Sequence, residues 1–119
     1  MRRSALSPED LAIACARLCD EMKAEDILIL DVRKLTQITD YFLLCSAASE
    51  RQLKAIADRI HRDLKAQGVT CLGIEGEAVG GWVLVDYVDV VVHLFSREAR
   101  DFYALEMLWG DAPKADWQP

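Results

Sequence analysis

The most informative absence in this sequence is that of a long hydrophobic run. None of its 119 residues lies in a stretch that approaches the roughly 20 consecutive apolar residues of a membrane-spanning helix. The N-terminal segment 1–14 contains Glu9 and Asp10 before any sustained apolar stretch, which is unlike a secretory signal. The sequence therefore predicts a soluble, cytoplasmic protein with no membrane partner.

The sequence lacks the cysteine placement of a disulfide framework. The four cysteines are Cys15, Cys19, Cys45 and Cys71. All four lie within apolar patterns of predicted helices or strands, which is typical of reduced, buried thiols. The first two are four residues apart on one predicted helix and could form a zinc site with His61 and His93. Because His93 lies within VVVHLF, a packed core is the favoured interpretation, and no metal is expected.

Positive charge is in deficit. The chain has 14 basic against 20 acidic residues and a net charge of −6, which disfavours direct binding to a nucleic-acid backbone and favours a basic protein as partner. The main basic cluster comprises Arg59, His61, Arg62 and Lys65. It is intermixed with Asp58 and Asp63 on one predicted helix, so we interpret it as a solvated face.

The length of the chain suits one domain that folds without a disulfide or a metal. Helical spacing of apolar residues predicts helices over 8–23, 49–67 and 97–109. A serine that can act as N-cap lies at the start of each helix or just before it, namely Ser7, Ser49 and Ser96. The second helix is the best defined, because Ser49 and Gln52 form a capping box and Gly68 follows its last turn.

Five short runs rich in Val, Ile, Leu and aromatic residues predict strands. They span residues 26–32, 41–46, 69–74, 82–86 and 89–95. The helix 49–67 can make a right-handed crossover that sets the second and third strands parallel, and the turn 86–89 sets the last two antiparallel. We therefore expect a single α/β domain over 1–112, with a mixed five-stranded sheet flanked by helices, and a loose tail over 113–119.

The predicted hairpin 81–95 is the most distinctive part of the sheet. On a regular strand, Trp82 and Leu84 share one face with Asp86, and the alternate residues share the other face. A large aromatic side chain beside a carboxylate suggests contact with a partner. Tryptophan is equally common as a cap on a core, so both interpretations of Trp82 stay open on composition alone.

An enzymatic alternative depends on three aspartates. Asp40, Asp86 and Asp89 could hold Mg²⁺ in a nucleotidyl-transfer site. Such a site also needs a phosphate cradle, and segment 46–49 offers hydroxyl groups but no glycine. His93 has no recognisable nucleophile partner and fits a hydrogen-bonded strand histidine. The favoured interpretation is that the aspartates end strands and shape turns.

Several segments resemble a known family when they are taken together and in order. They read DYFLLCSAASERQLKAIADRI, then EG, then GWVLVDYVDVVVHLF and finally FYALEMLWGDA. This combination closely resembles the ribosomal silencing factor family, also called Iojap, over about residues 26–112. The resemblance implies a nucleotidyltransferase-like fold that has no transferase activity and no cofactor.

The resemblance also implies a function. Members of the family bind the large-subunit ribosomal protein uL14 on the surface that faces the small subunit, and so block subunit joining and lower translation when nutrients are scarce. Members are commonly homodimers when free, and mitochondrial and chloroplast relatives serve assembly of the large subunit. For this chain it implies a translational repressor that needs no direct contact with nucleic acid.

The resemblance places the partner surface on the predicted hairpin and its surroundings. Carried onto this sequence, the expected contact residues are Trp82, Val83, Leu84, Asp86, Tyr87, Asp89, Asp40 and Tyr41. The sequence departs from the family pattern at Val88, where glycine is usual, and at Ala47 and Ala48, where glycine is common. Because a β-branched residue tolerates a positive φ poorly, the turn at Val88 is the point at which the pattern is least secure.

Overall fold

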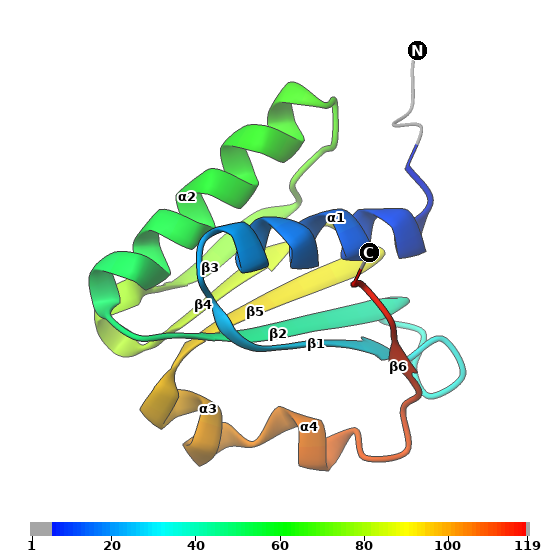
Figure 1. Cartoon of the computed structure of the whole chain (residues 1–119). Helices are drawn as coiled ribbons and strands as arrows, with labels where there is room; N and C mark the ends of the chain where they lie inside the picture. The colour runs from blue at the N-terminus through cyan, green and yellow to red at the C-terminus, as the bar shows by residue number, and fades with distance from the viewer. Residues whose placement is uncertain (1–5, 119) are drawn as a thin grey trace.

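The protein folds into three layers, with one mixed β-sheet between two layers of helices (Figure 1). The structure, a computed structural model, describes residues 6–118. Residues 1–5, part of the segment that is unlike a secretory signal, and the final tail residue 119 lie outside the described residues. In chain order the elements are α1 (Pro8–Glu21), β1 (Glu25–Asp31), β2 (Tyr41–Ala47), α2 (Glu50–Ala66), β3 (Gly73–Glu77), the 3₁₀ helix η1 (Ala78–Gly80), β4 (Trp82–Asp86), β5 (Val90–Ser96), α3 (Arg97–Tyr103), α4 (Leu105–Leu108) and β6 (Lys114–Ala115).

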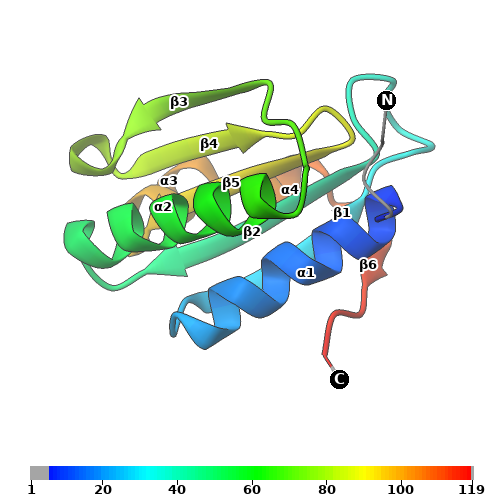
Figure 2. The same ribbon diagram turned by 90° about the horizontal axis from the view of Figure 1, so that it is seen from above.

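The sheet has the strand order β3-β4-β5-β2-β1-β6, which places β3 at one edge (Figure 2). The central strands β2 and β5 are parallel, and every other neighbouring pair is antiparallel. It follows that β2 and β3 run in the same direction, as the predicted crossover through α2 requires. They are not neighbours, however, because β5 and β4 lie between them.

The prediction of five strands was one short, and the C-terminal tail explains the difference. Strand β6 pairs antiparallel with β1, so the tail expected to be loose is part of the sheet. The backbone carbonyl of Trp117 also accepts a hydrogen bond from Arg17 Nε at 3.1 Å, and the Trp117 ring packs against the main core. Covering an otherwise exposed edge strand explains why this short pairing forms.

The two faces of the sheet are covered to different extents. The covered face, defined as the side beneath α1 and α2, carries buried residues such as Leu43, Val85 and Val92. The open face, defined as the side that bears α3 and α4, carries the alternate residues, with Leu44 and Phe95 at the centre of a smaller core. Figure 2 shows α1 and α2 on one side of the sheet and the two short helices on the other.

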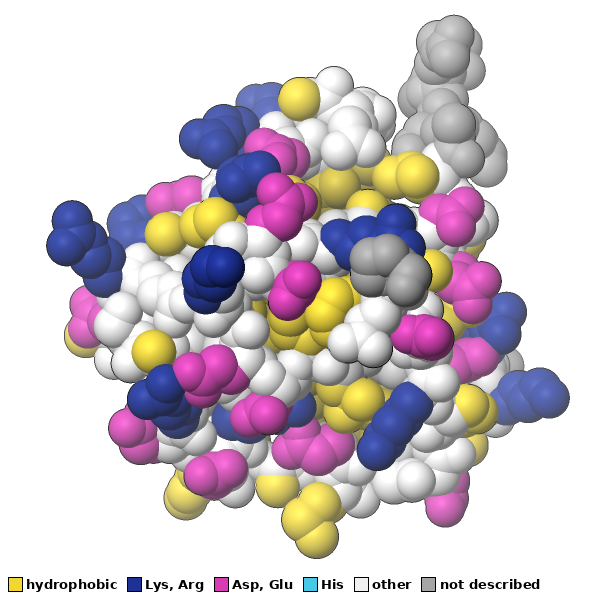
Figure 3. Space-filling view, in the orientation of Figure 1, with side chains coloured by type: hydrophobic (Ala, Val, Ile, Leu, Met, Phe, Trp, Pro, Cys, Tyr) yellow, Lys and Arg dark blue, Asp and Glu magenta, His cyan; other side chains and the backbone are white. Residues whose placement is uncertain are grey.

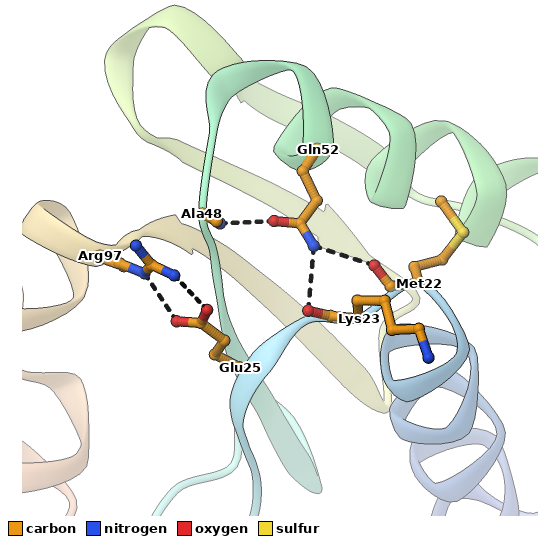
Figure 4. Close-up of polar contacts among 6 residues, drawn as sticks. All are labelled: Met22, Lys23, Glu25, Ala48, Gln52 and Arg97. Atoms are coloured by element: carbon orange, nitrogen blue, oxygen red, sulfur yellow. Dashed lines mark hydrogen bonds and ion pairs between the residues drawn. The ribbon is translucent and has the colours of Figure 1, made fainter.

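Side-chain caps define how α1 and α2 begin. The hydroxyl of Ser7 accepts from the Asp10 amide at 3.1 Å, and that of Ser49 accepts from the Gln52 amide at 3.0 Å. The Gln52 side chain reaches back to accept from the Ala48 amide at 2.6 Å, and its amide nitrogen donates to the carbonyl groups of Met22 and Lys23 at the end of α1 (Figure 4). One side chain thus completes a cap and joins the two helices.

The last predicted helix, 97–109, is divided into α3 and α4 by Ala104, which has a φ of 46°. The division allows Glu106 to accept a hydrogen bond at 2.6 Å from Nε of the buried Arg100. In an unbroken helix, residues six apart point in different directions and could not form this pair. A second donor of Arg100 reaches the buried hydroxyl of Ser46 at 3.2 Å, so the guanidinium is held between helix and sheet.

The cysteines are free thiols, in agreement with the sequence. Cys15, Cys19 and Cys45 are buried and Cys71 is partly exposed. Burial raises the pKa of Cys15 to about 12, which keeps its thiol protonated and unreactive. Within residues 6–118, no helix is long and apolar enough to cross a membrane.

Candidate protein-interaction surface

Strand β4 divides its side chains between the two faces of the sheet. Trp82, Leu84 and Asp86 point to the open face and are partly exposed, whereas the residues between them are buried on the covered face. On the open face, Leu84 is paired with His93 of β5 and with Glu75 of β3. Trp82 packs against Tyr103 at the end of α3, yet it and Leu84 remain partly exposed on this face.

Trp82 is held in place by contacts within the protein. Its Nε1–H donates a hydrogen bond to Nδ1 of His93 at 3.1 Å. Its ring lies 4.4 Å from the ring of Tyr103 and 5.1 Å from that of Phe95, measured between centroids. The polar atom of the indole is therefore satisfied internally, and the exposed part of the ring is apolar. A fixed aromatic ring loses little conformational entropy on binding, which suits an anchor at a protein interface.

His93 accepts the hydrogen bond of Trp82 from the neighbouring strand β5. Its side chain is buried, and burial lowers its pKa to about 4, so the ring is neutral at pH 7. A neutral ring that accepts at Nδ1 carries its proton on Nε2. Phe42 packs edge-on at 5.3 Å between ring centroids. The interpretation of His93 as a hydrogen-bonded strand histidine agrees with this geometry.

Tyr103 and Phe102 extend the same surface and were not predicted as contact residues. Tyr103, at the end of α3, is 42% exposed, and Phe102 is 81% exposed and packs edge-on against it at 5.1 Å between ring centroids. Phe102 lies in the predicted helix 97–109, whose continuous helical spacing is interrupted at Ala104. Hydrophobic side chains project from the lower edge of Figure 3, where Figure 1 places α3 and α4.

We call Trp82, Leu84, Phe102 and Tyr103 the aromatic surface. A shallow hollow of about 240 Å³ lies beside it and is lined by Trp82 and Leu84 together with Glu75 and Gly76 of β3. Exposed aromatic and aliphatic side chains beside a shallow depression are typical of a surface that receives another protein. The described contacts hold Trp82 and Tyr103 in place before any partner arrives.

The predicted acidic residues gather at the far end of β4. Oδ1 of Asp86 accepts a hydrogen bond from the Val88 amide at 2.7 Å, which closes the turn around Val88, whose φ is +73°. The carbonyl of Asp89 accepts from the amides of Asp40 and Tyr41 at 3.0 and 3.1 Å. These backbone hydrogen bonds fasten the turn to the start of β2.

The remaining predicted contact residues lie in the core. Val83, Tyr87 and Tyr41 are all buried on the covered face. They pack in the core and so support the strands that carry the exposed residues. Asp86 is four residues from Trp82 on β4, a separation of about 13 Å along an antiparallel strand. The eight predicted residues therefore divide into part of the aromatic surface, an acidic turn, and a buried support.

The three aspartates do not assemble into a metal centre. Among residues 6–118, no group of three or more His, Cys, Asp or Glu side chains has an arrangement that could hold a metal ion. Within the same residues there is also no zinc site among Cys15, Cys19, His61 and His93. The side chain of Asp86 is instead engaged by the backbone of its own turn.

The sequence matches the family model described as "Ribosomal silencing factor during starvation" over residues 5–119. It is 47% identical over 106 residues to the ribosomal silencing factor RsfS of Bacillus subtilis, covering 89% of each chain. It is 34% identical over 95 residues to the mouse protein named "Mitochondrial assembly of ribosomal large subunit protein 1", covering 77% of this chain and 42% of the mouse protein.

A solved structure agrees with these sequence matches. The crystal structure of a protein from Chromobacterium violaceum superposes with a TM-score of 0.84 at 37% identity, covering 88% of each chain. The likeness therefore extends over most of the chain rather than over a single motif. On the combined evidence of sequence and structure, the chain belongs to the ribosomal silencing factor family.

Proposed function

We propose that this protein binds the large ribosomal subunit through the aromatic surface and thereby prevents the small subunit from joining. The observation that carries the proposal is Trp82, which is partly exposed yet fixed by His93 and Tyr103. The description of the family supports a silencing role, and the name of the mouse relative supports the large subunit as the target. The proposed site of action is the cytoplasm.

The proposed partner on the large subunit is the protein uL14. The charge distribution favours a basic protein, because the chain has a net charge of −6 and carboxylates flank the aromatic surface. Glu75 lies on β3 beside Leu84, and Asp86 and Asp89 lie at the other end of β4. Complementary charge accelerates encounter, while the buried apolar contact supplies most of the affinity.

The proposed mechanism is steric and needs no catalysis. The molecule measures 41 × 32 × 28 Å along its principal axes, which is large enough to keep two subunit surfaces apart when it is bound between them. We also propose that the fold is nucleotidyltransferase-like, as the resemblance implies, and that the protein has no transferase activity. We also propose that the free chain forms a homodimer, as the resemblance implies.

Assembly of the large subunit is the second candidate function, favoured by the name of the mouse relative. The two functions differ in the particle that is bound. A silencing factor binds mature large subunits, whereas an assembly factor prefers precursor particles. Comparing the affinity for mature and precursor large subunits separates the two candidates.

The proposal is tested with purified subunits on sucrose gradients and by light scattering during subunit joining. We expect the protein to migrate with large subunits, to be absent from small subunits, and to reduce the amplitude of joining when it is added first. Migration with small subunits alone, or joining that is unaffected at saturating protein, would refute it. Calorimetry with ATP and Mg²⁺ tests the enzymatic alternative, for which a saturable heat abolished in Asp86→Asn is the signature.

A further inference from the structure

Strand β3 is the least protected strand of the sheet. It pairs with β4 on one side, and it is the terminal strand in the order, so no described residue pairs with its other edge. Four of its five residues are exposed. Figure 2 shows β3 as the outermost strand, beyond the part of the sheet that α2 covers. An open edge of this kind can accept a further strand from another chain.

A groove lies alongside this edge, between α2 on one side and β3 and η1 on the other. It has a volume of about 390 Å³, and its apolar lining includes Ala57, Ile74, Val79 and Val83. Ile74 is 48% exposed and Val79 is 71% exposed. Large aliphatic side chains left this open beside the unpaired edge of β3 can accept an apolar side chain of a partner.

The rim of the groove is acidic. It contains the carboxylates of Glu50, Asp58 and Glu77 and a single lysine, Lys54. That lysine already forms an ion pair with Asp58 at 3.1 Å between Nζ and Oδ2. Two carboxylates therefore remain beside the groove with no ion pair among the described residues, and a segment carrying Lys or Arg would complement them.

The groove is continuous with the aromatic surface around the edge of the sheet. Gly76 lines both the groove and the hollow beside Trp82. Its φ is +83°, and a Cβ atom at this position would lie 2.2 Å from the carbonyl oxygen of Trp82. Only glycine fits there, so the strand at the edge is held tightly against the strand that carries Trp82.

We propose that an extended, basic segment of the large-subunit partner adds to the outer edge of β3 as a further strand and seats an apolar side chain over Ile74 in the groove. This inference rests on the proposed function, because it assigns the groove to the same partner that covers Trp82. The partner then contacts the edge of the sheet on both faces. Main-chain hydrogen bonds supply affinity, and the apolar pocket and acidic rim select the segment.

A second copy of this chain is a poorer occupant of the same edge. Antiparallel pairing of two β3 strands would bring Glu75 and Glu77 of one copy against those of the other. Like charges placed opposite each other across strands are destabilising. The acidic edge therefore discourages self-pairing and favours a partner of opposite charge.

The test compares two variants that make the same chemical change at exposed isoleucines. Ile74→Lys introduces a cation into the groove, and Ile38→Lys introduces one in the loop between β1 and β2, where Ile38 is 79% exposed. We expect Ile74→Lys to weaken binding to purified large subunits by about tenfold or more and Ile38→Lys to change it by less than about twofold. Circular dichroism verifies that both variants are folded. Substitution of Gly76 is unsuitable, because it would also disturb Trp82.

Hydrogen exchange distinguishes strand addition from simple contact. The amides among residues 73–77 that point away from β4 are expected to exchange at least about tenfold more slowly once purified uL14 is bound, because these edge amides become hydrogen-bonded. If wild type binds large subunits but Ile74→Lys binds equally well and these amides are unprotected, the inference is wrong while the proposed function stands. If wild type does not bind large subunits at all, both are wrong. If Ile74→Lys instead turns a dimer into a monomer without affecting subunit binding, a second copy occupies the groove and the inference is overturned.

Discussion

The two faces of the sheet are made by the same strands but are completed by different helices. The covered face lies under α1, with 14 residues, and α2, with 17, whereas the open face lies under α3, with seven, and α4, with four. Along β4 the consequence is visible residue by residue, because buried and partly exposed positions alternate. Apolar side chains on the covered face are accounted for by folding. On the open face near Trp82, apolar side chains remain partly exposed after folding, and the proposed function assigns them to a partner.

The largest loss of stability is expected when a cavity is made on the covered face. Ile56 is fully buried in α2, so Ile56→Ala is expected to lower the free energy of unfolding by about 3 kcal/mol. Leu84→Ala on the open face removes a partly exposed side chain and is expected to cost about 1 kcal/mol or less. Urea denaturation measures both variants. Equal losses would show that the open face contributes to folding as much as the covered face does.

The second effect concerns the buried histidine beneath the aromatic surface. Because burial lowers the pKa of His93 to about 4, the unfolded chain, in which histidine has a pKa of about 6.5, binds more protons between these two values. Stability is therefore fully present above pH 6.5 and decreases as the pH falls towards 4. The loss is expected to reach about 3 kcal/mol.

His93→Gln is the matched control for this titration, because glutamine can accept a hydrogen bond but does not titrate. Denaturation of both proteins between pH 7 and pH 4 should show a steeper decline for wild type. Arginine partners lower the pKa of some carboxyl groups, such as that of Glu25 beside Arg97 (Figure 4). The stability that these groups contribute is lost at lower pH, and this loss is common to both proteins. Parallel stability curves would mean that His93 is not held neutral by burial.

The smallest effect is expected at the turn that joins β4 to β5. Val88 has a φ of +73°, which is unfavourable for a β-branched residue by roughly 1–2 kcal/mol. Val88→Gly relieves this strain but loses more entropy on folding, so we expect a net stabilisation of about 1 kcal/mol or less. Thermal denaturation measures the change. A destabilised variant would show that the Val88 side chain contributes contacts that outweigh its strained backbone.

Local sequence signals predicted most of the fold. Ser7 and Ser49 cap the first two helices as expected, since an N-cap needs only a hydroxyl and the amides of the next turn. The span of β4 was predicted correctly because its alternation of buried and exposed residues is carried by neighbouring residues. The φ of Val88 is positive, at the turn position where the sequence predicted the least secure geometry.

The errors occur where distant residues decide the structure. Ala104 divides the last helix, and helical periodicity does not reveal the ion pair between Arg100 and Glu106 that the division allows. Strand β6 forms because β1 offers it an edge, and β3 lies four residues later than predicted at its start because β4 sets its register. The same limit applies to the surface: Tyr103 joins Trp82 only after the chain has folded, so the sequence identified the strand of the aromatic surface but not its helix.

The most direct test of the account is the affinity of Trp82→Ala for purified large subunits, measured beside Ile38→Ala. Both variants remove a large apolar side chain, but only Trp82 belongs to the aromatic surface. We expect Trp82→Ala to bind about 30-fold more weakly than wild type, equivalent to about 2 kcal/mol, and Ile38→Ala to bind within about twofold. A folded Trp82→Ala protein that binds large subunits as tightly as wild type would contradict the assignment of the open face to ribosome binding.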